Sequence, residues 1–434
     1  DNQSQAFIST GDVEVGIDIN ATTNAAATSG ITWPHNTDLL SRYGDINIET
    51  NGLLTWSNGD PRSVGASASS LVTTSSADVT ITASAFVDAT SNADSKISTS
   101  GAVRILPHST NFAADSHLNF EVEAASFEFG NVDQVNSSTK GIKLWRDITV
   151  AGPITVSATS ITVDLGVDLI STGLGDSILL KAKQFIDIEN LNTTDLRSDD
   201  SKHSVIQSNN GDIIFWADSD ANEEGLIWVP HNTRINSANG VYSYDAVSGG
   251  GDIIFAGGAD DGTGRPGGYA WDTGSRSEGP NLSDLGVGFG RFVDVFTGGG
   301  DMVVRAKAKN AGEAAFHFQG PSEFVTGTGQ LFIDAEAESA IQAFEFFDNA
   351  DRGTLFSSHA TLSPAISISA VSANQVAFEL RTSDSSNPSI IQSLATEGGG
   401  VSITANRTTS LTGAAAIFSA VNVLSRNGAI TVSS

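Results

Sequence analysis

An acidic tract that begins at Asp218 carries the residue types of a calcium-binding loop. Asp218, Asp220 and Asn222 place side-chain oxygens at the first, third and fifth positions, as an EF-hand loop does. The sixth position, where the loop needs glycine, is Glu223, and the twelfth position, where it needs a bidentate Glu, is Val229. The tract therefore predicts a solvated turn and no assignable metal site. Only loose association with Ca²⁺ or other cations is expected.

Two adjacent carboxylates, Asp260 and Asp261, precede Arg265, Tyr269 and Trp271 in a glycine-rich segment. A glycosidase needs two acids about 5 to 10 Å apart in a cleft. Adjacent strand residues point to opposite faces, so the pair is not expected to be a catalytic dyad. Arg265 and the two aromatic residues could form a sugar-binding edge, because aromatic faces stack on sugars. The favoured interpretation is a lid that only covers the flank of the fold.

The remaining candidate groups are scattered. Asp199 and Asp200, near His203, are adjacent in the same way, and the seven His are not spaced as zinc ligands. No Gly-x-Ser-x-Gly elbow joins a strand to a helix. Polysaccharide lyases with parallel β-helices combine clustered Asp ligands for Ca²⁺ with a basic residue, but the 22 Lys and Arg do not cluster beside acids. The sequence predicts no catalytic, cofactor-binding or metal-binding residue.

Composition narrows the class of protein. The 434 residues carry a formal net charge of −28, which disfavours nucleic acid and anionic lipid as partners. Cysteine is absent, so disulfides and thiolate metal sites are excluded. No apolar run reaches the roughly 18 residues of a membrane span. The polar start without Met indicates either a processed secreted protein or a segment of a longer chain.

A short repeat organises the chain. The pentapeptide Gly-Asp-Ile-Ile-Phe begins at Gly211 and again at Gly251, and looser copies place alternating β-branched residues after a glycine. Alternation of apolar and polar residues has the period of a strand, and the glycines and Asn-Gly pairs mark turns. The looser copies begin at Gly11, Gly44, Gly101, Gly152, Gly300, Gly329 and Gly428.

Stacking of such units predicts an all-β protein, a right-handed parallel β-helix or β-solenoid. Tandem β-sandwiches are the alternative, because they also contain short strands and Gly/Asn turns. We expect solenoid coils over residues 1–256, a Gly-rich loop excursion over 257–300, and further coils over 301–434 that finish without a polar cap.

The Gly-Asp-Ile-Ile-Phe strands at 211–216 and 251–256, the acidic turn at 217–225 and the terminal Asn-Gly-Ala-Ile-Thr-Val at 427–432 resemble filamentous-haemagglutinin-like proteins. These are large bacterial surface or secreted proteins. The resemblance covers most of the chain in repeat style, and it implies a long parallel β-helix that serves outside the cell as an adhesin, matrix component or fibre stalk. The family's N-terminal secretion domain is not recognisable in this sequence.

The expected function is that of an extracellular structural or adhesive protein on a bacterial cell surface, a rigid acidic solenoid. Its expected partners are copies of itself joined end to end, or cell-surface or matrix polysaccharide. The strand-like start at Phe7-Ile8 and the uncapped finish at Ile430-Thr-Val432 suggest joining through strand edges. The alternatives are a polysaccharide lyase or hydrolase that uses residues 257–300 as a wall, and a non-catalytic glycan-binding module.

Overall fold

A computed structural model describes most of the chain as strands and turns, and the chain divides into two compact units, Asp1–Gly173 and Leu174–Ser434. The described residues are 6–9, 17–22, 29–33, 37–41, 44–56, 70–73, 77–88, 96–131, 140–189, 203–245, 247–271, 285–309, 314–338, 342–348, 353–373, 376–382, 385–408 and 414–434.

The described residues of the N-terminal unit form four parallel sheets, each named here by its first strand. The β1 sheet comprises β1 (Ala6–Ser9), β4 (Thr37–Ser41), β7 (Ser70–Thr73), β10 (Lys96–Ser98), β13 (Glu121–Ala124), β16 (Ile148–Val150) and β19 (Leu169–Leu174). The β2 sheet comprises β2 (Ile17–Ala21), β5 (Ile46–Thr50), β8 (Val79–Ala83), β11 (Ala102–Pro107), β14 (Ser126–Phe129) and β17 (Ile154–Ala158). The β3 sheet comprises β3 (Ser29–Trp33), β6 (Leu53–Trp56) and β9 (Ala85–Asp88), and the β12 sheet comprises β12 (Ser116–Leu118), β15 (Ile142–Leu144) and β18 (Ile161–Val163).

The part of the C-terminal unit that the structure describes forms three parallel sheets. The β22 sheet comprises β22 (Ser204–Asn209), β25 (Thr233–Asn236), β30 (Asp294–Phe296), β33 (Glu323–Val325), β36 (Leu355–Ser358), β39 (Ser389–Ser393) and β42 (Val421–Ser425). The β20 sheet comprises β20 (Ile178–Ala182), β23 (Ile213–Ala217), β26 (Ile253–Asp260), β31 (Met302–Ala308), β34 (Leu331–Ala337), β37 (Ile366–Ser372), β40 (Gly400–Arg407) and β43 (Ala429–Ser433). The β21 sheet comprises β21 (Ile186–Ile188), β24 (Ile227–Val229), β29 (Val287–Phe289), β32 (Phe316–Phe318), β35 (Phe344–Asp348), β38 (Phe378–Thr382) and β41 (Ala416–Ser419).

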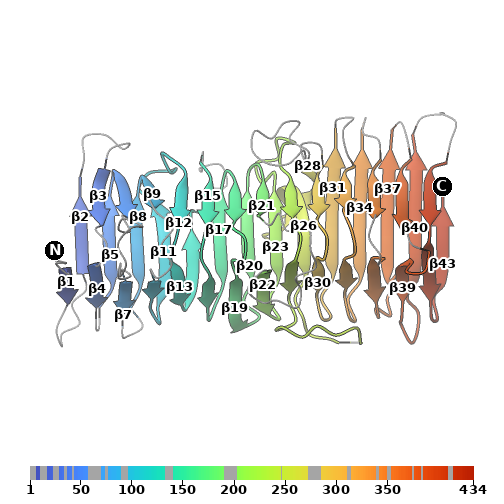
Figure 1. Ribbon diagram of the computed structural model, residues 1–434, viewed down its shortest axis with the longest axis horizontal. Coiled ribbons are helices and arrows are strands. Elements are labelled where there is room, and N and C mark those ends of the chain that lie inside the picture. Colours follow the sequence, from blue (N-terminus) through green and yellow to red (C-terminus); the bar gives the residue numbers. More distant parts are fainter. Residues whose placement is uncertain are drawn as a thin grey trace. The chain divides into compact units, whose positions relative to one another are not determined.

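Successive strands go to different sheets in rotation, so each coil adds one strand to each of three sheets (Figure 1). Neighbouring strands of a sheet run in the same direction, as in the pairing of Ile366 with Val401. A sandwich of hairpins would instead place its sequential strands antiparallel. The predicted all-β parallel β-helix is therefore confirmed, and the alternative of tandem β-sandwiches is wrong.

The core lies between the sheets and consists of in-register columns of apolar side chains. In β31, Met302, Val304 and Ala306 are buried and alternate with partly exposed residues. In the β21 sheet the columns are aromatic, and the rings of Phe344 and Phe378 stack with centroids 4.5 Å apart. Parallel in-register pairing places the same position of each coil in contact, which explains why like residues recur after each turn.

The Gly-rich segment forms a hairpin and then rejoins the coils. β26 pairs antiparallel with β27 (Pro266–Gly268), and β28 (Ala270–Trp271) pairs parallel with β31. Residues 272–284 lie outside the described part. β29 and β30 then occupy ordinary places in their sheets, so the described excursion is narrower than the expected 257–300.

The hairpin explains why the repeated pentapeptide lacks strand alternation. All five residues of β23 are buried, and the outer faces of β23 and β26 form an apolar cluster of Ile214, Trp216, Ile254 and Ala256. Trp216 Nε1 donates a hydrogen bond to the carbonyl of Gly258 at 2.7 Å, which ties the hairpin to this face. Strands covered on both sides become continuously apolar.

Candidate functional site

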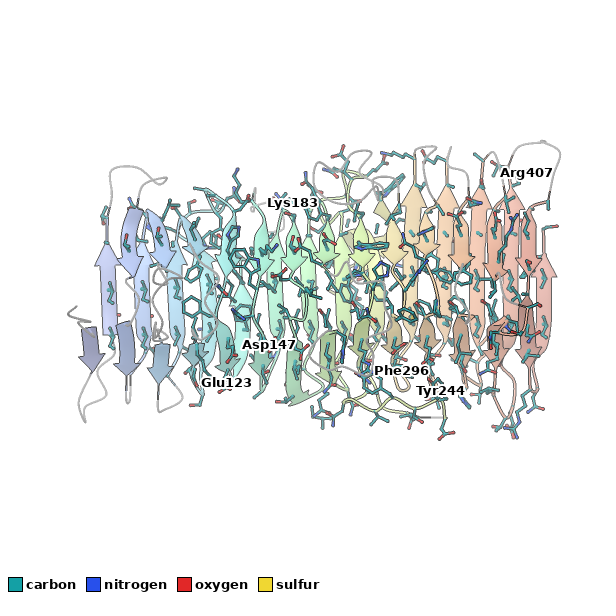
Figure 2. All side chains as sticks on the ribbon, viewed as in Figure 1. Glu123, Asp147, Lys183, Tyr244, Phe296 and Arg407 are labelled. Carbon is teal, nitrogen blue, oxygen red and sulfur yellow. The ribbon has the colours of Figure 1, made fainter. Side chains whose placement is uncertain are left out.

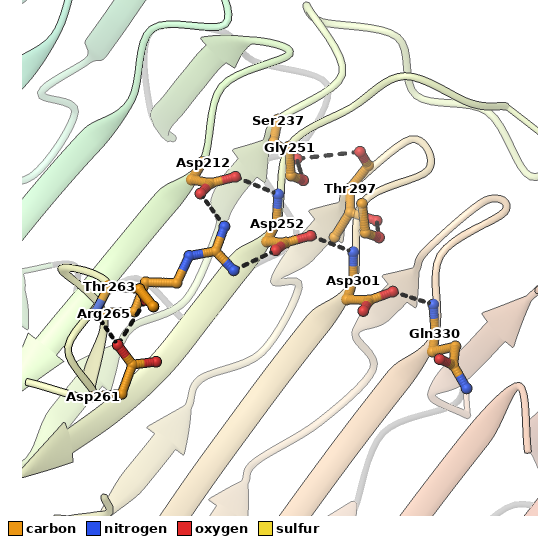
Figure 3. A network of polar contacts seen from close by, with 11 residues as sticks. Asp212, Ser237, Gly251, Asp252, Asp261, Thr263, Arg265, Thr297, Asp301 and Gln330 are labelled. Atoms are coloured by element: carbon orange, nitrogen blue, oxygen red, sulfur yellow. Dashed lines mark hydrogen bonds and ion pairs between the residues drawn. The ribbon is translucent and has the colours of Figure 1, made fainter. Parts of the chain in front are cut away.

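A ladder of polar side chains runs across the middle of the β20 sheet (Figure 3). Each of these side chains comes directly after the glycine that precedes a strand. Asp212 Oδ1 accepts the backbone N–H of Asp252 at 2.9 Å, and Asp252 Oδ1 accepts that of Asp301 at 2.8 Å. Asp301 Oδ1 accepts the N–H of Gln330 at 2.8 Å. Each carboxylate therefore satisfies a corner amide of the next coil, and this ladder of four residues links stacked coils.

The glycines before the ladder residues allow the corners to stack. A Cβ on Gly251 would lie 2.2 Å from the carbonyl carbon of Gly211. A Cβ on Gly300 would lie 2.1 Å from the carbonyl oxygen of Gly251, and one on Gly329 would lie 1.9 Å from that of Gly300. Because these neighbours are backbone atoms, no other residue fits, which gives the Gly-Asp repeat its physical reason.

Buried hydroxyl groups bond the same glycines from the adjoining β22 sheet. Ser237 Oγ donates to the carbonyl of Gly251 at 2.6 Å, and Thr326 Oγ1 donates to that of Gly329 at 2.7 Å. Both hydroxyl-bearing residues are fully buried. Each corner is therefore fixed by the ladder on one side and by a hydroxyl on the other, so its polar groups are satisfied without water.

Arg265 extends from the hairpin to two steps of the ladder. Its Nη1 lies 2.7 Å from Asp252 Oδ2, and its Nη2 pairs with Asp212 Oδ2. At the third step of the ladder, burial raises the pKa of Asp301. The hydrogen bond from the Gln330 N–H lowers that pKa, and the negative charge of Asp252 raises it further. One guanidinium thus balances two carboxylates and anchors the hairpin, which is a structural use of the residue predicted for a sugar-binding edge.

Asp260 and Asp261 do not form a catalytic pair. Asp260 Oδ1 accepts the N–H groups of Gly262 at 2.7 Å and Gly264 at 3.0 Å. Asp261 Oδ1 accepts the N–H of Thr263 at 2.8 Å and its hydroxyl at 2.6 Å, and these bonds hold the pKa of Asp261 below its usual value. The two carboxylates cap separate parts of one turn, as Asp does in short loops.

Trp271 is not an exposed platform for a sugar. Its side chain is 8% exposed, and the Nζ atoms of Lys307 and Lys309 lie 4.5 and 4.8 Å from the ring centroid. The two ammonium groups occupy the ring as cation–π partners. The alternative of a sugar-binding edge is therefore disfavoured at this residue, because β28 pairs with β31 and the lysines of and after β31 lie over the ring.

The acidic tract is a turn in which residues 221–224 are exposed, as the sequence predicted, but its first carboxylate is buried. Asp218 is 1% exposed, and its Oδ1 accepts the N–H groups of Asn222 at 2.9 Å and Glu223 at 3.0 Å. Burial raises the pKa of Asp218 to about 6. Among the residues that the structure describes, no group of three or more acidic or His side chains could hold a metal ion. The buried carboxylate organises the turn.

The second predicted acid pair, Asp199 and Asp200, lies outside the described residues. His203 is 2% exposed, and its Nε2 lies 3.3 Å from Arg234 Nη1. The carboxylate ladder was not predicted, although the repeated Gly-Asp dipeptide was its signal in the sequence. The same device occurs in the N-terminal unit, where Asp45 Oδ1 accepts the N–H of Asp78 at 2.9 Å.

Comparison with known proteins returns no match among family models, curated proteins or solved structures. The resemblance to filamentous-haemagglutinin-like proteins therefore stays a prediction. The described residues include no helix with the length and apolar character of a membrane span.

Proposed function

We propose that this chain is an extracellular structural and adhesive protein of a bacterial surface, in which coils braced by the carboxylate ladder form an acidic scaffold that associates with further copies. The observation that carries the proposal is the parallel β-helix itself, whose coils are linked by the carboxylate ladder and which carries a net charge of −28. In β41 and β43, Phe418, Ile430 and Val432 are between 37% and 51% exposed.

Phe418, Ile430 and Val432 belong to columns that form the core elsewhere, and Phe418 is the register partner of the buried Leu380. Ile430 and Val432 are the register partners of Val401 and Ile403 in β40, which are 1% and 0% exposed. β43 pairs with β40. A further coil of strands supplied by another copy would cover these side chains, and contacts of one face with a different face of the next copy generate filaments.

Sedimentation velocity over a range of protein concentrations tests this proposal. We expect concentration-dependent association, and we expect the double variant Ile430→Asp with Val432→Asp to remain monomeric, because buried unpaired charges oppose association. Leu362→Asp is the matched control, since Leu362 is 66% exposed outside this face, and it should associate like the unmodified chain. A monomer at every concentration, or association unaffected by the double variant, would overturn self-assembly.

A further inference from the structure

A groove of about 430 Å³ crosses the outer face of β31, β34 and β37. Two columns of in-register side chains form its floor. Each column takes one side chain from each of these three paired strands. The first column is Val303, Phe332 and Ser367, and the second is Arg305, Asp334 and Ser369.

The hairpin makes one wall of this groove. On β23 and β26 the hairpin covers the corresponding outer face, and Val303 packs against that covered cluster. Arg305 Nη1 donates to the carbonyl of Pro266 at 3.3 Å, and the Tyr269 hydroxyl donates to Asp334 Oδ2 at 2.7 Å. The residue next to Phe332 in its column is Ser367, whose side chain is much smaller. The outer face of the sheet is therefore hollow beside the hairpin.

The two columns present complementary chemistry at a defined spacing. Residues two apart on a strand lie about 6.6 Å apart on the same face, and adjacent strands lie about 4.8 Å apart. Phe332 thus offers an apolar ring surface beside a carboxylate acceptor, Asp334, and a guanidinium donor, Arg305. Arg305 and Asp334 are register partners, yet no ion pair joins them in the described chain. The hairpin contacts hold both in place, which reduces the entropy lost on binding.

We propose that this groove binds an uncharged saccharide. One face of a pyranose ring is made of C–H groups that can pack on Phe332, and hydroxyls along its edge can donate to Asp334 and accept from Arg305. The groove volume falls within the range of small-ligand sites, and six lining side chains are far fewer than the 20–30 residues a side of a stable protein interface. Asp334, Glu336 and the net charge of −28 disfavour an acidic polysaccharide.

This inference rests on the adhesive part of the proposed function, because it assigns that part a ligand class. Calorimetric titration of the full chain with neutral gluco-, galacto- and manno-oligosaccharides tests it. We expect binding of at least one of them, weakened about tenfold or more by Phe332→Ala or Arg305→Gln. Ser367→Trp fills the groove from its outer face without removing a core contact, so it should abolish binding even if Phe332→Ala fails to fold.

Tyr242→Ala is the matched control. Tyr242 is an exposed aromatic residue outside the groove, 39% exposed and packed edge-on against Phe296, with ring centroids 5.2 Å apart; Phe296 is labelled in Figure 2. Its removal should leave the affinity unchanged. Binding to none of the neutral sugars, preference for acidic ones, or equal affinity in Ser367→Trp would overturn the groove assignment. Self-association is measured separately by sedimentation, so failure of one proposal is distinguishable from failure of the other.

Discussion

At the scale of the residue, several acidic side chains of the described C-terminal unit act as hydrogen-bond acceptors for the backbone. Asp212, Asp252 and Asp301 each accept the corner amide of the next coil, and Asp218 accepts amides within its own turn. Carboxylates that accept backbone N–H groups are held by charge-assisted bonds, stronger than those between neutral groups. A high content of acidic residues is therefore compatible with a scaffold role without catalysis.

The pH dependence of stability tests the role of the buried Asp218 carboxylate. Its pKa rises from 3.8 to about 6 in the folded chain, because burial disfavours the carboxylate. The folded state then binds the proton more tightly than the unfolded state, so this contribution to stability is complete below pH 3.8 and is lost as the pH rises through about 6. Asp218→Asn keeps an acceptor oxygen and removes the charge, so we expect it to raise the free energy of unfolding above that window by about 1–3 kcal/mol.

Urea unfolding at a series of pH values measures the effect. The variant should also show a smaller change of stability with pH between 3.8 and about 6. Asp261→Asn is the control with the opposite sign, because hydrogen bonds from Thr263 lower the pKa of Asp261, and its carboxylate stabilises the fold above its unfolded pKa. If Asp218→Asn lowers stability at neutral pH, the hydrogen bonds to the charged form outweigh the desolvation of that form.

At the scale of the element, the glycine column decides whether coils can stack. Gly251→Ala places a Cβ 2.2 Å from a backbone carbon of the previous coil, and neither backbone can move without breaking the ladder. We expect a loss of at least about 3 kcal/mol in the free energy of unfolding, as for other severe backbone clashes. Gly249→Ala is the neighbouring control, because its φ is +99° but no atom lies within 4 Å of the added Cβ.

Gly249→Ala should cost only the roughly 1 kcal/mol of a strained backbone conformation. Thermal and urea unfolding of both variants give the comparison. Equal losses would show that backbone strain, not the close approach of the coils, sets the requirement for glycine in the Gly-Asp repeat.

The same elements show what the sequence could and could not predict. The parallel β-helix follows from the alternation and the glycine before each strand, because both are local signals. The hairpin that returns Arg265 to Asp212 was not predictable, since that contact spans 53 residues and no local pattern encodes it. For the same reason, the sequence could not show that Trp216 and Trp271 are buried and not exposed. The groove beside Phe332 exists only where that hairpin stops.

At the scale of the whole molecule, the net charge of −28 opposes the association of copies. Salt screens this repulsion, with a Debye length of about 10 Å at 0.1 M, while the apolar contact proposed for β41–β43 is not weakened by screening. We therefore expect the self-association constant to rise with NaCl. Since the described residues hold no metal-binding cluster, CaCl₂ at the same ionic strength should produce a similar rise, through loose association with the acidic surface.

Sedimentation equilibrium in matched NaCl and CaCl₂ series measures both effects, and the Ile430→Asp, Val432→Asp variant should stay monomeric in each. A far stronger response to Ca²⁺ at equal ionic strength would indicate a specific bridging site between copies and contradict the screening account. A fall in association with added NaCl would show that charge pairs, and not the exposed core columns of β43, hold the copies together.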